Sequence, residues 1–316
     1  MATTTRPNIH TSVLEGSDVV AAVDQGRATD AVRAVLRAAA RGEARPIAKS
    51  MAAWDDRSTA HTLGAVDESR GLVAFKSWVN TPAGASALLS LFDARTGAVL
   101  AVMDAGQLGA FRTAATAAVA TDLLAAPEAN VLTVLGSGRQ AFQQATAVSL
   151  VRPLEAIRVW SRTPANRQAF AVTLERELGL RVDQFDDARD AVDGSPIVTA
   201  VTRAADPFLA REWLAPGAHV NAVGAILPSA AELLPGVVEA GSLVVVDDLE
   251  NARRASKELK DALGDDLAGT VELGRLLEDG VGRPDQPALT VFKGMGSGLC
   301  DLAVAALVLD RQEVGA

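Results

Sequence analysis

The sequence of 316 residues contains no tyrosine, only 4% aromatic residues and a single cysteine, Cys300. One cysteine cannot form an intramolecular disulfide, so we expect a protein of the reducing cytoplasm. We expect Cys300 itself to be a small buried apolar side chain rather than a nucleophile. The three histidines, His10, His61 and His219, lack the spacing of metal ligands, so no metal site is expected.

Positive charge and long apolar runs are also scarce. The formal net charge is -9, which argues against a nucleic acid as partner. No apolar run approaches the roughly 20 residues of a membrane-spanning helix, and the N-terminus has no signal-peptide pattern, so we expect no membrane partner. What the sequence does contain is 49% hydrophobic residues, mostly Ala, Val and Leu, over a length sufficient for two domains. This composition is typical of an α/β protein with buried strands.

The first part of the chain combines a helix with strands. We expect residues 1–10 to be a loose polar end, and Thr29 or Asp30 to cap a helix that runs to Arg41. An extended segment is predicted over residues 43–54. Residues 71–79 alternate so that Lys76 shares one strand face with apolar neighbours.

The next segment predicts a hairpin followed by a helix. Residues 86–92 and 98–103 are predicted to be antiparallel strands around a turn. Residues 104–110 are predicted to be a glycine-containing loop, which makes Arg112 and Thr113 the opening residues of an alanine-rich helix. At a helix N-terminus the fork of Arg112 is suited to grip a carboxylate. Thr113 is suited to cap the helix or to contact a cofactor phosphate.

Strand and helix patterns alternate from residue 131 onwards. Helices are predicted from the turn after the first strand to about residue 150, and over residues 163–178 and 299–309. This alternation predicts a doubly wound parallel sheet. The predicted strands cover residues 131–135, 157–160, 197–201, 219–223, 243–246 and 289–292.

A glycine-rich turn with the pattern G-x-G-x-x-A follows the first of these strands. Its first glycine allows a tight turn, its second allows a pyrophosphate to approach the backbone, and Ala141 lets the helix pack close to the strand. Phosphates would bind at the N-terminus of that helix. We therefore predict a dinucleotide site that includes Gly136, Ser137, Gly138, Arg139 and Gln140.

The end of the second strand selects between the two nicotinamide cofactors. An acidic residue at this point binds the ribose 2′-OH of NAD, whereas an arginine accommodates the 2′-phosphate of NADP. This chain has Ser161, Arg162 and Thr163 there, with Arg167 about one helical turn later and no carboxylate at the strand end. We predict that these residues favour NADP(H), with NAD(H) as the alternative. Both arginines could also be merely solvated residues at a helix start.

Lys76 has two interpretations when the residues alone are considered. A lysine within an apolar strand can be a charge that protects a sheet edge from pairing. It can equally be an amine facing a cleft, where it binds a carboxylate or transfers protons. The pattern does not decide between them.

The motifs taken together resemble the ornithine cyclodeaminase/mu-crystallin family. Residues 75–76, 91–115, 221–233 and 291–303, with VLGSGRQA and VWSRT between them, occur in the order seen in that family, from about Arg45 onwards. The resemblance implies a homodimer with an α+β substrate-binding and dimerisation domain of antiparallel strands over residues 1–112, completed by 294–316. It implies a Rossmann-type dinucleotide-binding domain over residues 113–293.

The resemblance also implies the roles of individual residues. Lys76 matches the active-site lysine of the family, and Arg112 matches its carboxylate-binding arginine. A second basic group upstream would be Lys49 or Arg45. The implied substrate is a small amino or imino acid.

One position departs from the family's cyclodeaminases. They have an aspartate where this sequence has Ile226, and an isoleucine can neither accept a proton nor pair with an ammonium group. We therefore predict an NAD(P)H-dependent reductase of a cyclic ketimine, Δ1-pyrroline-2-carboxylate or Δ1-piperideine-2-carboxylate, with Lys76 or a water that it orders as proton source. One alternative is an ornithine cyclodeaminase or alanine-type amino acid dehydrogenase. Another is a mu-crystallin-like protein that binds NADPH and a ligand.

Overall fold

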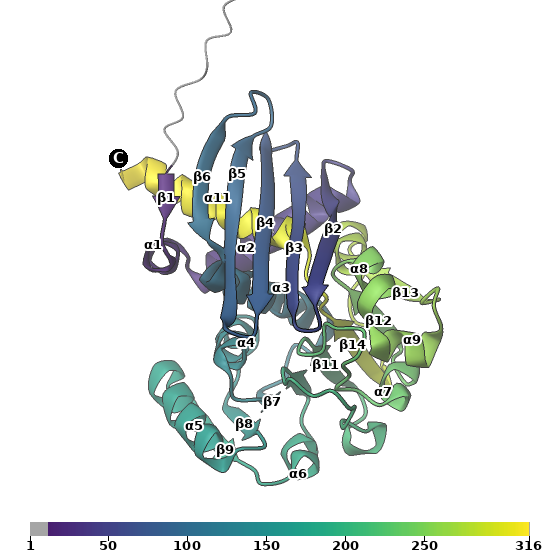
Figure 1. The fold of residues 1–316 in the computed structure, drawn as a ribbon. Helices are drawn as coiled ribbons and strands as arrows, with labels where there is room; N and C mark the ends of the chain where they lie inside the picture. Colours follow the sequence, from purple (N-terminus) through teal and green to yellow (C-terminus); the bar gives the residue numbers. More distant parts are fainter. Residues whose placement is uncertain (1–11, 316) are drawn as a thin grey trace, which may run out of the picture. The chain divides into compact units, whose positions relative to one another are not determined.

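A computed structural model describes residues 12–315 and divides the chain into two compact units (Figure 1). Unit 1 comprises Met1–Arg112 and Ser297–Ala316, and unit 2 comprises Thr113–Gly296. The sequence-based boundaries differ only at the second junction, where they separate residues 293 and 294. The predicted loose end, including His10, lies outside the described residues.

Unit 1 is built on a six-stranded sheet with the order β1-β6-β5-β4-β3-β2. Strands β2 to β6 pair antiparallel in sequence, and β1 adds to β6 in parallel. The predicted hairpin of β5 and β6 is confirmed, and so is the extended segment that forms β2. Strands β1 and β3 were not predicted. The strands are β1 (Ser12–Leu14), β2 (Ala44–Asp55), β3 (Ser58–Asp67), β4 (Leu72–Thr81), β5 (Gly84–Asp93) and β6 (Val99–Asp104).

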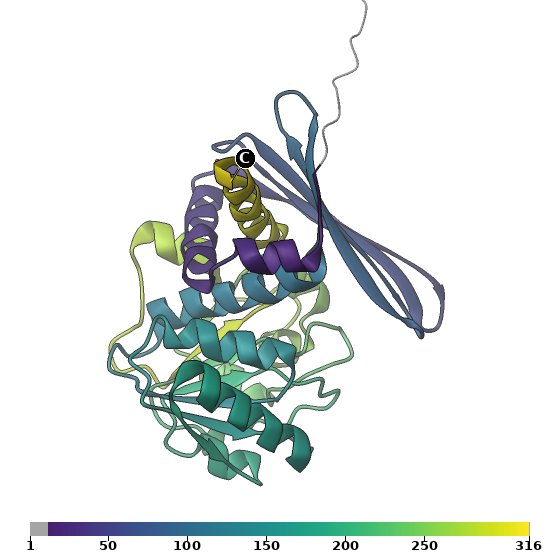
Figure 2. The same cartoon turned by 90° about the vertical axis from the view of Figure 1, so that its left-hand side faces the viewer.

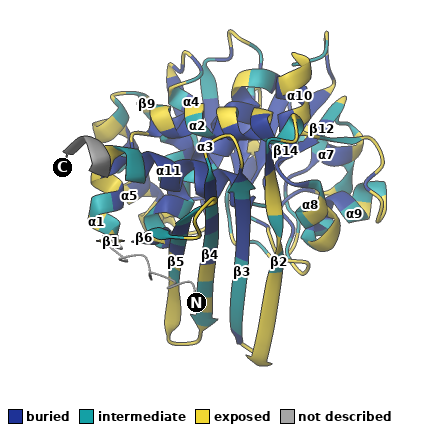
Figure 3. Ribbon diagram, turned by 90° about the horizontal axis from the view of Figure 1, so that it is seen from above, coloured by how far each residue is buried: buried dark blue, intermediate teal, exposed yellow. Residues whose placement is uncertain are grey.

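Helices cover one face of this sheet (Figure 2). Helix α11 (Gly298–Gly315) packs on β3 and β4, and α2 (Gln25–Ala40) packs on α11 and β2, with α1 (Gly16–Ala22) beside them. The covered face buries Leu89 and Leu91 completely, whereas Leu88 on the opposite face is 48% exposed. The turn ends of β2 to β5 extend beyond the helices and are exposed (Figure 3).

The predicted start of α2 is wrong by several residues. Asp24 caps this helix, and its carboxylate accepts a hydrogen bond from the Arg27 backbone N–H at 3.0 Å. Thr29 lies inside the helix, where its hydroxyl donates to the Gln25 carbonyl at 2.9 Å. The first turn is stabilised because Gln25 and Ala28 are buried, and the local sequence does not reveal that packing.

The predicted loop over residues 104–110 is also wrong. Helix α3 (Ala105–Leu124) begins directly after β6, and the Asp104 carboxylate accepts a hydrogen bond from the Gly106 N–H at 2.9 Å. Burial of Leu108 stabilises the start of the helix in spite of Gly106 and Gly109. Arg112 and Thr113 therefore lie about two turns into the helix, and its N-terminus cannot assist them.

Unit 2 contains an eight-stranded sheet with the order β13-β12-β14-β11-β10-β7-β8-β9, and all its strand pairs are parallel. The order β9-β8-β7-β10-β11 is that of a Rossmann fold, which confirms the predicted fold class. The edge strands β9 and β13 were not predicted. The strands are β7 (Val131–Leu135), β8 (Ala156–Trp160), β9 (Arg181–Gln184), β10 (Ile197–Ala200), β11 (Ala218–Ala222), β12 (Leu243–Val246), β13 (Thr270–Glu272) and β14 (Leu289–Lys293).

Helices connect these parallel strands, and apolar clusters bury both faces of the sheet. No helix within residues 12–315 is both long and apolar enough to cross a lipid bilayer. The helices of unit 2 are the second part of α3, α4 (Arg139–Ser149), α5 (Pro164–Leu178), α6 (Ala188–Val192), α7 (Pro235–Glu239), α8 (Leu249–Ala255), α9 (Lys257–Leu263) and α10 (Leu273–Asp279).

A hydrogen-bonded polar chain crosses the interior of unit 2. The His219 ring is fully buried and contacts the Thr290 hydroxyl and the Asn221 amide oxygen, each at 3.0 Å. Asn221 in turn donates to the Thr121 hydroxyl at 2.9 Å. Burial lowers the pKa of His219 to about 3, so the folded protein holds this ring neutral.

We expect His219 to make the stability depend on pH. Its pKa is about 3 in the folded chain against an ordinary value of 6.5, so below pH 6.5 only the unfolded chain gains the proton. The free energy of unfolding should therefore fall by about 2 kcal/mol from this group between pH 7 and pH 5. Urea unfolding of His219→Gln should show a smaller loss over that range than the parent protein. Equal losses would contradict the expectation.

Candidate active site

Unit 1 buries a carboxylate between two basic side chains. Asp301, on α11, accepts hydrogen bonds from the Lys76 Nζ at 2.7 and 2.9 Å and from the Arg112 Nε at 3.1 Å. Asp301 is 1% exposed and Lys76 is 7% exposed. The edge-strand explanation of Lys76 is wrong, because β4 lies between β3 and β5. From this central strand the Lys76 side chain forms an ion pair with Asp301.

Burial and neighbouring charges set the protonation of Lys76. Burial lowers the pKa of this lysine, Asp301 acts against that effect, and the Arg112 charge lowers the pKa further. A lysine with a lowered pKa gives up its proton more readily than an ordinary lysine. The three groups together carry one excess positive charge, which favours an anionic ligand.

Lys49 joins these groups through an aromatic side chain. Its Nζ lies 5.0 Å from the centroid of the Trp78 ring, and the Lys76 Nζ lies 5.4 Å from the same centroid. The register of β2 shifts between Ile47 and Ser50, and such a bulge can redirect a side chain. We call Lys49, Lys76, Arg112 and Asp301 the basic cluster.

The second predicted candidate, Arg45, is not part of the basic cluster. Its side chain is exposed and forms an ion pair with Glu68 at the surface. Of the two upstream candidates, the structure therefore brings only Lys49 near Lys76. Asp301 was not predicted as a site residue, although it lies within the segment 291–303 that resembles the family.

Unit 2 contains a cavity of about 850 Å³ at the glycine turn. Gly136 has φ +135°, and a Cβ atom there would lie 2.7 Å from the Val201 carbonyl oxygen, so only glycine fits. The turn leads into α4, whose first residue is Arg139. The cavity has a size typical of ligand sites, and a helix N-terminus suits a pyrophosphate. These residues fit a dinucleotide.

Most of the predicted cofactor residues line this cavity, but two do not. Those that line it are Gly136, Ser137, Gly138, Arg139, Gln140, Ser161, Arg162 and Thr163. Thr113 and Arg167 are absent from the lining. The structure adds residues that the sequence reasoning missed, from the end of β8, the first turn of α5 and the segments after β10 and β11: Trp160, Asn166, Val201, Thr202, Arg203, Ala204, Ala205, Asp206, Phe208, Val223 and Gly224.

Arg167 has a structural contact instead of the predicted phosphate contact. It is 7% exposed, forms an ion pair with Asp186 and donates to the Ser161 carbonyl at 3.1 Å. These contacts stabilise the turn after β8. Three exposed arginines line the cavity, Arg139, Arg162 and Arg203, and Asp206 lies among the same lining residues.

Ile226 lies two residues after Gly224, which lines the cavity. Ile226 is 48% exposed and Leu227 is 57% exposed. Ile226 and Leu227 therefore present an apolar surface on unit 2.

The strand order and the glycine turn define a dinucleotide-binding unit, joined to a second unit that buries a basic cluster. The chain belongs to the ornithine cyclodeaminase/mu-crystallin family, because the model of that family matches residues 10–315. The resemblance seen in the sequence is confirmed. Over 225 residues the chain is 36% identical to the ketimine reductase mu-crystallin of Mus musculus, covering 71% of this chain and 69% of that protein.

Two solved structures are similar over nearly the whole chain. One is Thermococcus litoralis Δ1-pyrroline-2-carboxylate reductase in complex with NADH and L-proline, with a TM-score of 0.91 and 26% identity, covering 97% of this chain and 99% of that one. The other is an archaeal alanine dehydrogenase dimer with bound NAD, with a TM-score of 0.90 and 25% identity, covering 96% of this chain and 97% of that one.

The two glycines of the turn should respond differently to substitution. Gly136→Ala should lower the midpoint of thermal unfolding, because its Cβ would meet the Val201 carbonyl. Gly138→Ala meets nothing within 4 Å, so the midpoint should not change, but NADPH binding should weaken at the pyrophosphate. Thermal unfolding and fluorescence titration with NADPH measure both effects. The assignment would be contradicted if Gly136→Ala unfolded at the same temperature as the parent protein, or if Gly138→Ala bound NADPH as tightly as the parent.

Proposed function

We propose that the protein reduces a cyclic ketimine carboxylate, such as Δ1-pyrroline-2-carboxylate or Δ1-piperideine-2-carboxylate, to the cyclic L-amino acid with NAD(P)H. The observation that carries the proposal is the buried contact between Lys76 and Asp301 with Arg112 beside it. Family membership and the similarity to a Δ1-pyrroline-2-carboxylate reductase support it.

The substrate carboxylate binds to the cationic side of the basic cluster. Arg112 offers a planar guanidinium that matches a carboxylate, and Lys49 and Lys76 add positive charge. Asp301 neutralises only one of these charges, so an anion remains favourable. Trp78, on which the His61 ring stacks at 4.7 Å, provides a flat surface beside both lysines.

The reduction needs a hydride at the imine carbon and a proton at the imine nitrogen. A bound dihydronicotinamide supplies the hydride. Lys76 donates the proton, either directly or through a water that it orders. Burial alone would favour the neutral amine, and Asp301 counteracts this by stabilising the ammonium form. Asp301 therefore favours the protonated form of Lys76, and the charge of Arg112 makes that proton easier to release.

Ile226 favours ketimine reduction over cyclodeamination. A cyclic ketimine has no distal ammonium group, so it needs no acidic partner at this position. Ile226, at the position where the family's cyclodeaminases have an aspartate, could not pair with the distal ammonium group of ornithine. The exposed apolar surface of Ile226 and Leu227 supports the same choice.

We further propose that the protein forms a homodimer through the uncovered sheet face of unit 1. Val79 and Leu88 are 43% and 48% exposed on this face, beside a cavity of about 650 Å³. Exposed apolar surface of this kind is typical of interfaces between proteins. The similar archaeal alanine dehydrogenase is described as a dimer.

Turnover is tested by following NADPH absorbance with the two cyclic ketimines. Lys76→Ala should lower kcat by roughly a hundredfold or more, because proton transfer is lost. In Asp301→Asn the pKa of Lys76 should fall further, so the alkaline limb of the pH–rate profile should move to lower pH. Asp310→Asn, a more exposed carboxylate on the same helix, is the matched control. A parental rate in Lys76→Ala, or an unmoved limb in Asp301→Asn, would contradict the mechanism.

We also propose a preference for NADP(H), supported by Arg162 and Arg203 in the cavity lining. Arg162→Ala should raise the KM for NADPH roughly tenfold, since a charged hydrogen bond is lost, and should barely change the KM for NADH. Arg176→Ala, an exposed arginine on α5, is the control. A parent enzyme that prefers NADH would overturn the preference.

A further inference from the structure

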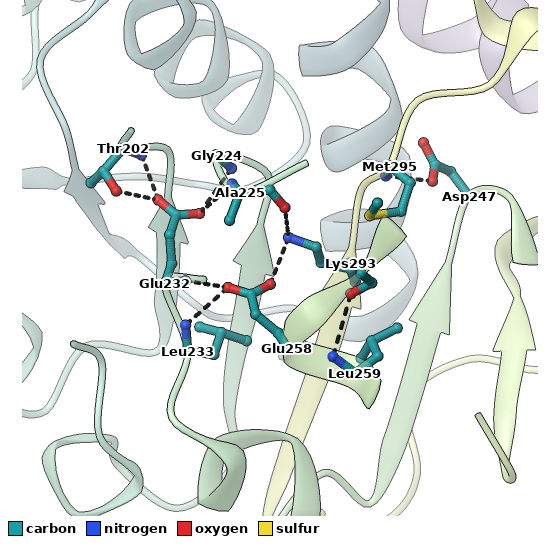
Figure 4. Close-up of polar contacts among 11 residues, drawn as sticks. Thr202, Gly224, Ala225, Glu232, Leu233, Asp247, Glu258, Leu259, Lys293 and Met295 are labelled. Atoms are coloured by element: carbon teal, nitrogen blue, oxygen red, sulfur yellow. Dashed lines mark hydrogen bonds and ion pairs between the residues drawn. The ribbon is translucent and has the colours of Figure 1, made fainter. Parts of the chain in front are cut away.

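A buried carboxylate connects two segments that line the cofactor cavity. Glu232 is completely buried, and its Oε1 accepts hydrogen bonds from the Thr202 N–H and from the Thr202 hydroxyl at 2.7 Å. Its Oε2 accepts from the N–H groups of Gly224 at 2.8 Å and Ala225 at 3.2 Å. Thr202 follows β10 and Gly224 follows β11, and both line the cavity. One side chain therefore holds both segments (Figure 4).

A second carboxylate and a lysine hold Glu232 and the β11 segment in place. Glu258, on α9, accepts from the backbone N–H groups of Glu232 and Leu233, the latter at 2.9 Å. It also pairs with the Lys293 Nζ at 2.6 Å, and that ammonium donates to the Ala225 carbonyl at 2.5 Å. Glu258 and Lys293 are 2% and 0% exposed. These contacts form a closed ring, visible in Figure 4. It runs from Glu232 to Ala225, on to Lys293 and Glu258, and back to Glu232.

The packing at Gly224 shows how tightly these segments are joined. A Cβ atom at this position would lie 2.3 Å from the Thr202 carbonyl oxygen and 2.5 Å from the Glu232 Oε1. The segments after β10 and β11 therefore touch without room for a methyl group. A small change in the position of Glu232 must move at least one of them.

Stability alone does not explain this arrangement. Removing charges from water is costly, and a buried ion pair is often no more stabilising than apolar residues of the same volume. Burial indeed raises the pKa of Glu232, and the hydrogen bonds from Thr202 act against that effect. What the charges do provide is geometry, since each carboxylate oxygen meets defined backbone donors.

We propose that Glu232 is a positioning residue for the cofactor, which sets the spacing of the β10 and β11 segments through its contacts with Thr202 and Gly224. Glu258 and Lys293 hold it in that position. Glu232 itself does not line the cavity. The proposal rests on the proposed function only in that the cavity binds a dinucleotide.

Glu232→Gln tests the proposal at constant side-chain size. An amide has one acceptor oxygen, so its NH2 group must face the donors of either Thr202 or the Gly224 segment, and one segment is released. The released segment must be ordered again when the cofactor binds, and a cost equal to that of one unsatisfied buried donor corresponds to roughly a tenfold loss of affinity or more. The Kd for NADPH, measured by fluorescence titration, should rise by that factor. The KM for NADPH should rise with it, while kcat at saturating NADPH stays near the parental value.

Two further variants keep the experiment decisive. Glu239→Gln, an exposed carboxylate on α7, is the matched control and should bind NADPH like the parent. Glu258→Gln keeps an acceptor for the Glu232 and Leu233 N–H groups but loses the charge that pairs with Lys293. It should also raise the Kd, and it replaces Glu232→Gln if that variant does not fold.

The outcomes separate this proposal from the function on which it rests. A folded Glu232→Gln or Glu258→Gln that binds NADPH within about twofold of the parent overturns the positioning role, even if its unfolding temperature is lower. A parent protein that binds NADPH but reduces no ketimine leaves the positioning role intact and contradicts the proposed function.

Discussion

The basic cluster of unit 1 depends on one buried carboxylate that two cations share. Asp301 contacts Lys76 and Arg112 within 3.1 Å in an interior where an isolated charge would be costly. Asp301 offsets the cost of burying Lys76 on the sheet of unit 1 and pairs with the partly buried Arg112 of α3. The same contact leaves one positive charge over, so what stabilises the cations also makes the cluster attractive to a carboxylate ligand.

Unit 2 also contains charged side chains that are buried and hydrogen-bonded. Glu232 and Glu258 are buried against backbone N–H groups, and Lys293 pairs with Glu258. These contacts lie behind the cavity lining, whereas the basic cluster of unit 1 is proposed to contact substrate. Buried charge thus joins cavity-lining segments in one unit, and in the other it is proposed to set the protonation of Lys76.

Local sequence patterns predicted the elements whose packing is also local. The strand and glycine turn around Gly136 were predicted because an apolar strand, the G-x-G-x-x-A turn and the following helix all lie within one short segment. Asp301 was missed because its partner Lys76 is 225 residues away in the sequence. The start of α3 was missed because burial of Leu108 outweighs two glycines, and Arg167 was assigned to phosphate because Asp186 is distant in sequence.

The most direct test of the shared carboxylate is the pKa of Lys76 itself, measured by NMR of ¹⁵N-labelled lysine in the parent protein and in Asp301→Asn. The pKa of Lys76 should lie below its ordinary value of 10.5 in the parent and should fall further in the variant. An ordinary pKa in the parent, or the same value in both proteins, would contradict this expectation.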